Sequence, residues 1–129
     1  MKVLFATAEA APFVKAGGLA DVMGSLPQAL RKRVVGARGV LPLYDTIPAN
    51  YREQMQYIGY TYVSVGWRSQ YCGVFELTLD GVRFYFLDNE YYFKRGRIYG
   101  EYDDAERFAF FSRAVLDILP IIGFYPDVI

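Results

Sequence analysis

The sequence predicts an α/β fold: a Rossmann-like parallel sheet that carries an antiparallel hairpin insertion. Three observations predict it. A short apolar run, a Gly-containing loop and a stretch of helical periodicity open the chain. Three runs of aromatic and β-branched residues fill the middle, and a second helical stretch follows them. Strand, loop, helix and strand form the opening βαβ unit of a parallel sheet. At 129 residues and 53% hydrophobic, the chain amounts to one domain with ample material for a core.

The first third of the chain supplies this βαβ unit. Residues 3–7 are mostly apolar and are bounded by a polar loop over 8–18, which is typical of a strand buried on both faces. A helix is predicted over 19–33, because its apolar residues recur at helical spacing and its last residues are cationic, as the helix dipole favours. Pro27 is expected to kink this helix. A second strand is predicted over 38–41.

The middle of the chain predicts the antiparallel part. Runs 58–65, 71–79 and 82–87 have the composition of strands. Asp80-Gly81 separates the last two runs and is a two-residue hairpin signal. Segment 88–100 is predicted to be a loop. The parallel core is therefore expected to carry an antiparallel insertion or edge hairpin.

The end of the chain predicts a helix from Asp103 to about Leu119, closed by Pro120 and Gly123. Its apolar stripe toward the core is expected to be Phe108, Phe111, Val115, Ile118 and Ile122. Residues 124–129 are typical of the approach to another parallel strand. Because a core strand that has only begun leaves a sheet unpaired, we expect the chain to be truncated there.

Composition excludes several classes of function. Lys+Arg and Asp+Glu are both 14, so the charge favours neither nucleic acid nor an anionic membrane as a partner. Histidine is absent and Cys72 is the single cysteine, which excludes an internal disulfide, a His/Cys zinc site and a Ser–His or Cys–His catalytic pair. Cys72 is predicted to be a small core residue.

The first apolar run also bears on location. It stops at Glu9 and is shorter than the roughly 7–15 apolar residues of a secretory signal, and no run approaches the ~18 residues of a membrane span. We therefore expect a cytoplasmic location.

The strongest candidate site is the loop Lys15-Ala16-Gly17-Gly18, followed by Asp21. Paired glycines before a helix let the backbone approach a ligand, and the helix N-terminus offers N–H groups and a partial positive charge. Lys15 adds a mobile cation suited to phosphate. In an open α/β sheet this loop lies at the carboxyl end of a strand, where ligands bind. The alternative is a flexible Gly-Gly connection beside a solvated lysine.

Nine short segments, spread over nearly the whole chain, form a distinctive series. They are Lys2-Val3-Leu4-Phe5, Ala8-Glu9-Ala10-Ala11-Pro12-Phe13, Lys15-Ala16-Gly17-Gly18-Leu19, Asp21-Val22, Leu26-Pro27, Phe86-Leu87-Asp88, Tyr99-Gly100, Asp104-Ala105-Glu106-Arg107-Phe108 and Pro126-Asp127-Val128-Ile129. In sequence and in order these segments closely resemble the opening of bacterial glycogen synthases and plant starch synthases.

The resemblance implies a two-domain GT-B glycosyltransferase. Residues 1–129 would be the N-terminal part of its acceptor-side Rossmann-like domain, and the C-terminal nucleotide-binding domain is absent from the chain. The reaction implied is transfer of glucose from ADP-glucose (or UDP-glucose) to the non-reducing end of an α-1,4-glucan, with retention of configuration and with no metal or cofactor.

The resemblance also implies roles for individual residues. Lys15 matches a lysine that contacts the sugar nucleotide near its phosphates, and Gly17 and Gly18 match glycines that bring backbone N–H groups there. Asp21 matches an acidic residue that faces the cleft, although an Asp in the first helical turn is often a surface residue that complements the dipole.

Two weaker candidates follow from the same match. Glu9 would face donor or acceptor sugar, against the alternative of an exposed loop carboxylate. Tyr99 would stack on or hydrogen-bond a sugar, against the alternative of a packing or surface residue.

Departures from the family pattern qualify these expectations. Ala16 stands where the family usually has Thr, and Gly39 lies inside the second strand, which it is expected to weaken by about 0.5–1 kcal/mol. The family's His-x-x-Asp-Trp stretch and its pyrophosphate-binding Arg/Lys pair lie outside these residues. We therefore assign no catalytic residue within the chain and expect the chain alone to be inactive. A non-catalytic glucan or sugar-nucleotide binding module, or a truncated, self-associating product, stays an alternative.

Overall fold

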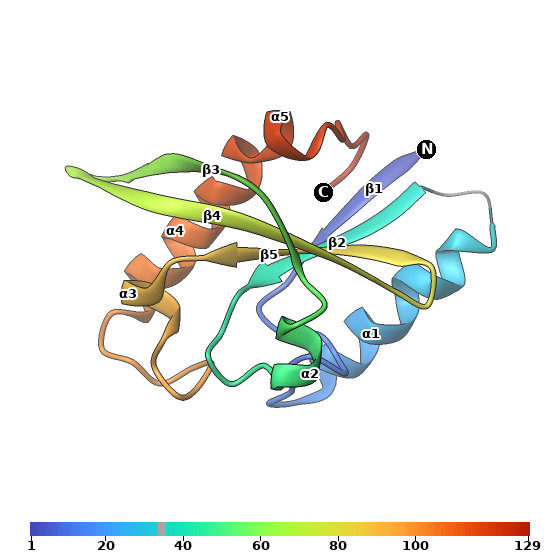
Figure 1. Cartoon of the computed structure of the whole chain (residues 1–129), viewed down its shortest axis with the longest axis horizontal. Coiled ribbons are helices and arrows are strands. Elements are labelled where there is room, and N and C mark those ends of the chain that lie inside the picture. Colours follow the sequence, from blue (N-terminus) through green and yellow to red (C-terminus); the bar gives the residue numbers. More distant parts are fainter. Residues whose placement is uncertain (34–35) are drawn as a thin grey trace.

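The computed structural model describes residues 1–33 and 36–129 and shows one mixed sheet with helices on its two faces (Figure 1). The strand order is β1-β2-β5-β4-β3. The strands are β1 (Lys2–Ala6), β2 (Gly36–Pro42), β3 (Gln56–Val65), β4 (Arg68–Leu79) and β5 (Val82–Asp88). The helices are α1 (Gly18–Arg31), α2 (Ala49–Arg52), α3 (Glu90–Phe93), α4 (Asp104–Asp117) and α5 (Leu119–Ile122). No helix among the described residues is long and apolar enough to cross a membrane.

The parallel half of the sheet confirms the predicted βαβ unit. β1 pairs with β2 in parallel, and β2 pairs with β5 in parallel. The register between β1 and β2 runs without a shift from Lys2 opposite Gly36 to Ala6 opposite Val40. The strand predicted over 38–41 is therefore present and is three residues longer than expected.

The antiparallel half is a β3–β4–β5 meander. The predicted Asp80-Gly81 turn joins β4 to β5, and both residues have positive φ, 50° and 79°, as a type I′ turn requires. A second hairpin, which the sequence analysis missed, turns at Gly66 and Trp67, so β4 begins at Arg68. The insertion thus consists of β3 and β4, while β5 belongs to both halves.

Gly39 has a packing role in β2 that its low strand propensity conceals. The ring of Phe84 on β5 lies over it, and a Cβ built at Gly39 would be 2.6 Å from Cδ1 of Phe84. Phe84 is buried and meets Phe13 edge-on, with 5.1 Å between ring centroids. The glycine makes room for this aromatic contact, so a larger residue would not simply strengthen the strand.

Helix α1 turns a different face to the sheet than its apolar periodicity predicted. Ala20 and Pro27 are buried, and Gly24 comes so close to the preceding loop that a Cβ there would be 2.6 Å from the carbonyl oxygen of Ala11. Small residues therefore face inward, because the helix packs against backbone. Three of the apolar residues at helical spacing stay 38–49% exposed: Leu19, Val22 and Leu26. The helix is continuous through Pro27.

Helix α4 packs on one face of the sheet, mainly against β3. Within the predicted stripe, Phe111, Val115 and Ile118 are buried, whereas Phe108 and Ile122 are only partly so. Other buried residues of this helix were not predicted: Arg107, Phe110 and Ala114. The one-turn helices α2 and α3 were also missed, since four residues show no periodicity.

Two further expectations are confirmed. Cys72 is fully buried in the core, and Gly123, in the left-handed conformation with φ of 62°, ends a helix. That helix is the separate turn α5, which contains Pro120, so Pro120 does not close the predicted helix. The last residues, predicted to approach another parallel strand, lie against β1: Val128 forms a parallel bridge with Val3, and the N–H of Leu4 donates to the carbonyl of Val128 at 3.0 Å. The C-terminus accordingly lies beside β1 (Figure 1).

Candidate functional site

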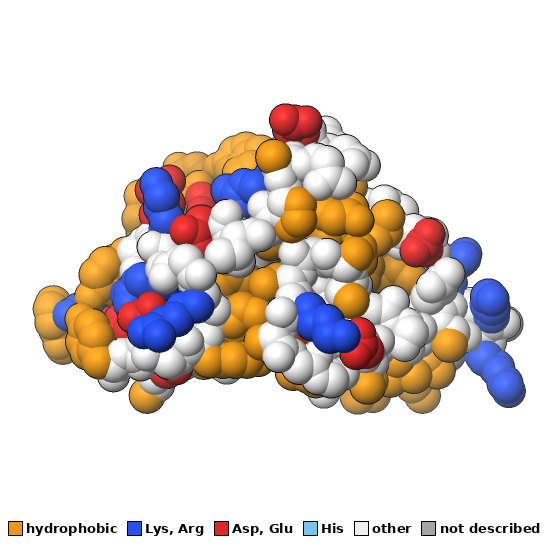
Figure 2. Space-filling view, turned by 90° about the horizontal axis from the view of Figure 1, so that it is seen from below, with side chains coloured by type: hydrophobic (Ala, Val, Ile, Leu, Met, Phe, Trp, Pro, Cys, Tyr) orange, Lys and Arg blue, Asp and Glu red, His pale blue; other side chains and the backbone are white. Residues whose placement is uncertain are grey.

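Three loops meet at the carboxyl ends of the parallel strands, in the lower part of Figure 1. They connect β1 to α1, β2 to α2, and α3 to α4. A cavity of about 400 Å³ between them is lined by Pro12, Phe13, Val14, Lys15, Ala16, Thr46, Pro48, Gly96, Arg97 and Ile98. Figure 2, seen from below, shows this side of the molecule, where charged side chains of both signs lie among hydrophobic ones. In open α/β sheets this edge is where ligands bind.

Glu9 lies beneath the first of these loops and is 2% exposed. Its Oε1 accepts hydrogen bonds from the N–H groups of Gly17 and Ala20 at 3.0 and 3.1 Å. Its Oε2 accepts from the N–H of Ala16 and from the hydroxyl of Tyr99, each at 3.2 Å. The alternative of an exposed loop carboxylate is therefore wrong, because the carboxylate is turned inward against the N-terminus of α1.

The main chain of Glu9 is held as well. The hydroxyl of Thr7 donates to the carbonyl of Glu9 at 2.7 Å, and the N–H of Glu9 donates back to that hydroxyl oxygen at 3.3 Å. Thr7 is buried directly after β1, so this local turn aims the Glu9 side chain under the loop.

Lys15 and Asp21 form an exposed ion pair over the same loop. Nζ of Lys15 donates to both carboxylate oxygens of Asp21, at 2.9 and 2.8 Å. Their side chains are 56% and 58% exposed, and such a pair is worth only about 0–1 kcal/mol. An anionic ligand can therefore compete for the ammonium group at little cost.

The two glycines differ in their surroundings. Gly17 is the N-cap of α1, and its N–H is already bound to Glu9. Gly18 is exposed, and among the described residues nothing lies within 4 Å of a Cβ built on it. Neither glycine has positive φ. The described part of the chain therefore gives neither a packing reason nor a backbone reason for glycine at position 18.

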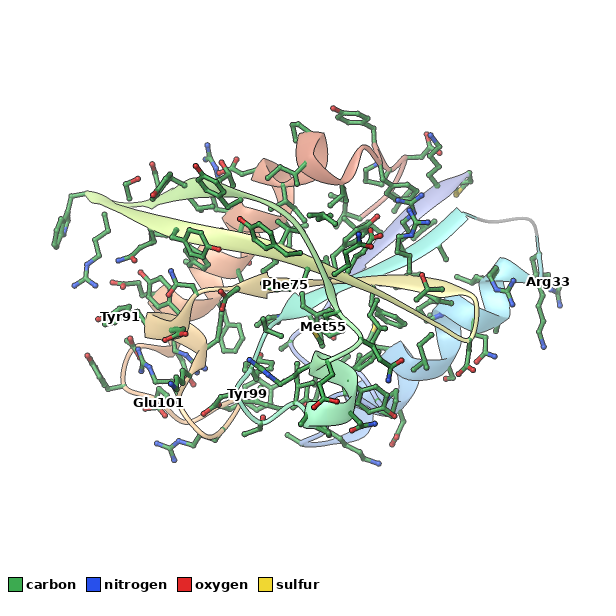
Figure 3. The ribbon with its side chains drawn as sticks, in the orientation of Figure 1. Arg33, Met55, Phe75, Tyr91, Tyr99 and Glu101 are labelled. Atoms are coloured by element: carbon green, nitrogen blue, oxygen red, sulfur yellow. The ribbon has the colours of Figure 1, made fainter. Side chains whose placement is uncertain are left out.

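Tyr99 belongs to the third loop, together with Glu101, and is 42% exposed (Figure 3). Its ring leans on Phe108, with 5.9 Å between centroids. Partial burial, followed by the negative charge of Glu9 and the hydrogen bond to it, raises the pKa of the Tyr99 hydroxyl. Tyr99 thus joins the third loop to the first through Glu9.

Arg107 anchors the third loop and was not predicted as a site residue. Its guanidinium is fully buried, and it donates to the carbonyls of Tyr92 and Ile98 at 2.6 and 2.9 Å and to Asp104 at 2.8 Å. Asp104 in turn accepts from the N–H of Gly100. No signal in the sequence distinguished this arginine from a surface cation, apart from its place in a family-like segment.

Tyr44 is a second residue that the sequence analysis missed. It is fully buried after β2, and its hydroxyl donates to the carbonyl of Ala8 at 2.7 Å. Burial, and secondarily its neighbour Tyr99, raises its pKa far above the ordinary value. Through this hydrogen bond, Tyr44 connects the loop after β2 to the loop after β1.

The described residues contain no cluster of three or more His, Cys, Asp or Glu side chains suited to a metal ion. The polar groups that this edge exposes include the side chains of Lys15 and Asp21, the amide of Gly18 and part of Tyr99.

Comparison with known families identifies the chain. Residues 2–129 match the family described as the starch synthase catalytic domain. The chain belongs to this family. The starch synthase family is one of glycosyltransferases, and the mixed sheet described above is part of its GT-B fold.

Several relatives support this assignment over the whole chain. Glycogen synthases of Geobacillus thermodenitrificans (strain NG80-2) and Geobacillus stearothermophilus are each 60% identical over 129 residues, and that of Lactobacillus acidophilus is 55% identical. The chain covers 27% of the length of each. The chain thus spans about a quarter of the length of these relatives.

A solved structure agrees with the fold. The catalytic domain of starch synthase IV from Arabidopsis thaliana, bound to ADP and acarbose, superposes with a TM-score of 0.86 at 31% identity. The comparison covers 98% of our chain and 27% of that one.

Proposed function

We propose that the chain is the acceptor-side, N-terminal part of a glucosyltransferase that transfers glucose from ADP-glucose to the non-reducing end of an α-1,4-glucan with retention. UDP-glucose is the alternative donor, and a cytoplasmic location is part of the proposal. The exposed Lys15–Gly18 loop at the carboxyl edge of the sheet carries it. The ADP and acarbose bound to the Arabidopsis relative support a nucleotide and an α-glucan as ligands.

The loop offers two groups to a sugar nucleotide. The Lys15 ammonium is a compact, mobile cation whose exposed partner Asp21 is easily replaced by a phosphate. The open backbone at Gly18 lets that phosphate approach the N-terminus of α1, where the helix dipole favours negative charge. Asp21, once released, is free to face a sugar hydroxyl.

The rest of the machinery is expected outside residues 1–129. Transition-state charge on the departing nucleotide needs preorganised positive groups, and such electrostatic stabilisation is usually the largest single contribution to catalysis. In this chain the cavity is lined by two such charges, Lys15 and Arg97. The chain by itself is therefore expected to bind weakly and to transfer no glucose.

A chimera tests this function. This chain would replace the corresponding N-terminal 27% of the Geobacillus stearothermophilus glycogen synthase, and glucose incorporation from ADP-glucose into glycogen would be measured. We expect an active enzyme whose kcat/KM falls at least about tenfold on Lys15→Ala, or ~1.4 kcal/mol of transition-state binding. Gly18→Ala should leave the unfolding temperature unchanged and still lower kcat/KM. The added methyl group would contact no other described residue and would obstruct only the ligand.

Lys32→Ala is the matched control, since Lys32 is an exposed lysine at the other end of α1. Equal activities of the Lys15→Ala and Lys32→Ala chimeras would contradict the site. Transfer by residues 1–129 alone, above its Lys15→Ala variant, would contradict the assignment of the remaining machinery.

A further inference from the structure

We propose that Glu9 is a positioning residue: its carboxylate permanently fills the anion position at the N-terminus of α1 and thereby fixes the Lys15–Gly18 loop for the donor. The inference rests on the proposed function for its effect on the donor. The geometry of the carboxylate itself is independent of it.

The carboxylate satisfies backbone donors that a helix N-terminus otherwise leaves open. The first four N–H groups of a helix have no intrahelical partner, and Gly17, the N-cap residue, has no side chain to accept from them. Glu9, eight residues earlier, takes that part. It accepts from the N–H of Gly17 and Ala20, and also from Ala16 just before the helix.

Burial makes this arrangement costly to leave. A carboxylate that is 2% exposed needs its hydrogen bonds, because an unpaired buried charge is strongly unfavourable. Each oxygen of Glu9 accepts two hydrogen bonds, three of the four from backbone amides and one from the hydroxyl of Tyr99. With both oxygens engaged and the side chain buried, Glu9 holds the loop rather than touching the reacting sugar.

The position of Glu9 also decides which amides remain for a ligand. The amides of Ala16, Gly17 and Ala20 are taken. Among the described residues, neither Gly18 nor Leu19 uses its N–H in a hydrogen bond, and both are exposed. A phosphate that reaches this terminus therefore meets Gly18 and Leu19 beside Lys15, whereas the deeper anion position is already filled.

Hydrogen exchange of backbone amides tests the geometry in the chain itself, without any ligand. Glu9→Gln keeps the size of the side chain but replaces an accepting oxygen with a donating NH2 group. We expect exchange at Ala16, Gly17 and Ala20 to become about 10- to 100-fold faster, the factor that loss of charge-assisted hydrogen bonds implies. Tyr99→Phe, which removes one of the four contacts, should change these amides less than Glu9→Gln does.

Asn89→Ala is the matched control. Asn89 is also buried, at 4% exposure, and also holds backbone groups, those of Tyr71 and Tyr92, away from the Lys15–Gly18 loop. Its removal should loosen the fold without singling out the three amides. The inference is overturned if Glu9→Gln and Asn89→Ala accelerate the same amides equally, or if the three amides exchange freely in the unmodified chain.

Kinetics in the chimera separate positioning from chemistry. A loop that only positions the donor contributes to ground state and transition state alike, so Glu9→Gln should raise KM for ADP-glucose at least about tenfold with kcat within about threefold. A fall in kcat at unchanged KM, with the three amides still protected, would make Glu9 a catalytic residue and overturn the inference. An inactive chimera with an unmodified chain would refute the proposed function, while hydrogen exchange would still decide the role of Glu9.

Discussion

At the residue scale, buried polar side chains do most to shape the candidate site. Arg107 shows why. It is fully buried in α4, and its guanidinium reaches out of the helix to two backbone carbonyls and to Asp104. Its Nη2 has no hydrogen-bond partner among the described residues. Such a group is retained for the backbone it holds, since an apolar residue of similar size would be cheaper to bury.

We predict that Arg107→Leu lowers the free energy of unfolding by about 2–4 kcal/mol, because two buried carbonyls lose their donor. The free energy of unfolding of Arg107→Lys should lie between those of the unmodified chain and Arg107→Leu, since an ammonium group cannot reproduce the planar fork of donors in a guanidinium group. Urea denaturation checks both. Arg113→Ala is the control: Arg113 lies on the same helix, is 62% exposed and pairs with Asp117, and should cost less than ~0.5 kcal/mol. Equal losses for Arg107 and Arg113 would contradict the anchoring role.

At the element scale, the loop between α3 and α4 is held by ionised groups as well as by the packing of Ile98 in the core. Arg95 donates to both oxygens of Asp103 at 2.9 Å, and this contact lowers the pKa of Asp103. The N–H of Gly100, followed in effect by Arg107, lowers the pKa of Asp104. The order of the loop that presents Tyr99 is therefore linked to pH.

Acid should loosen this loop. A carboxyl whose folded pKa lies below the ordinary value of 3.8 stabilises the fold above that value and loses the contribution as pH falls through the folded pKa. We predict that Asp104→Asn destabilises the chain near neutral pH and that the difference from the unmodified chain narrows below about pH 4. Asp80→Asn, in the β4–β5 turn where Asn also accepts positive φ, is the control. A difference that stays constant down to about pH 3 would contradict the linkage.

At the scale of the whole molecule, β3 is an edge strand that carries exposed aromatic rings. Tyr60 and Tyr71 stack with 5.9 Å between centroids on the neighbouring strands β3 and β4. The exposed rings of this region are Tyr57, Tyr60, Tyr62 and Trp67. Unpaired edges and apolar surface favour pairing with a second chain, and this keeps self-association as an open alternative.

We predict that the sedimentation coefficient of the isolated chain rises with concentration. Tyr62→Lys, which places a charge on the edge strand, should weaken the association about tenfold, or ~1.4 kcal/mol. Tyr102→Lys is the control, because Tyr102 is 91% exposed but lies before α4, outside the sheet. A monomer at all concentrations, or equal effects of the two substitutions, would contradict association through β3.

The sequence by itself determined the features that depend on local chemistry. The βαβ opening followed from periodicity. The Asp80-Gly81 turn and the helix end at Gly123 followed from residue types that tolerate the positive φ angles found there. Family membership followed from short motifs such as Lys15-x-Gly-Gly, which can be recognised without any knowledge of the fold.

Only the tertiary structure decided how the candidate site is held. Glu9 meets Tyr99 across 90 positions of sequence, and Gly39 is explained by Phe84 on another strand. The inward face of α1 is set by backbone contact with Ala11 and so contradicts its apolar periodicity. These outcomes depend on which segments become neighbours in space, and burial of a polar group is favourable only where such neighbours provide its hydrogen bonds.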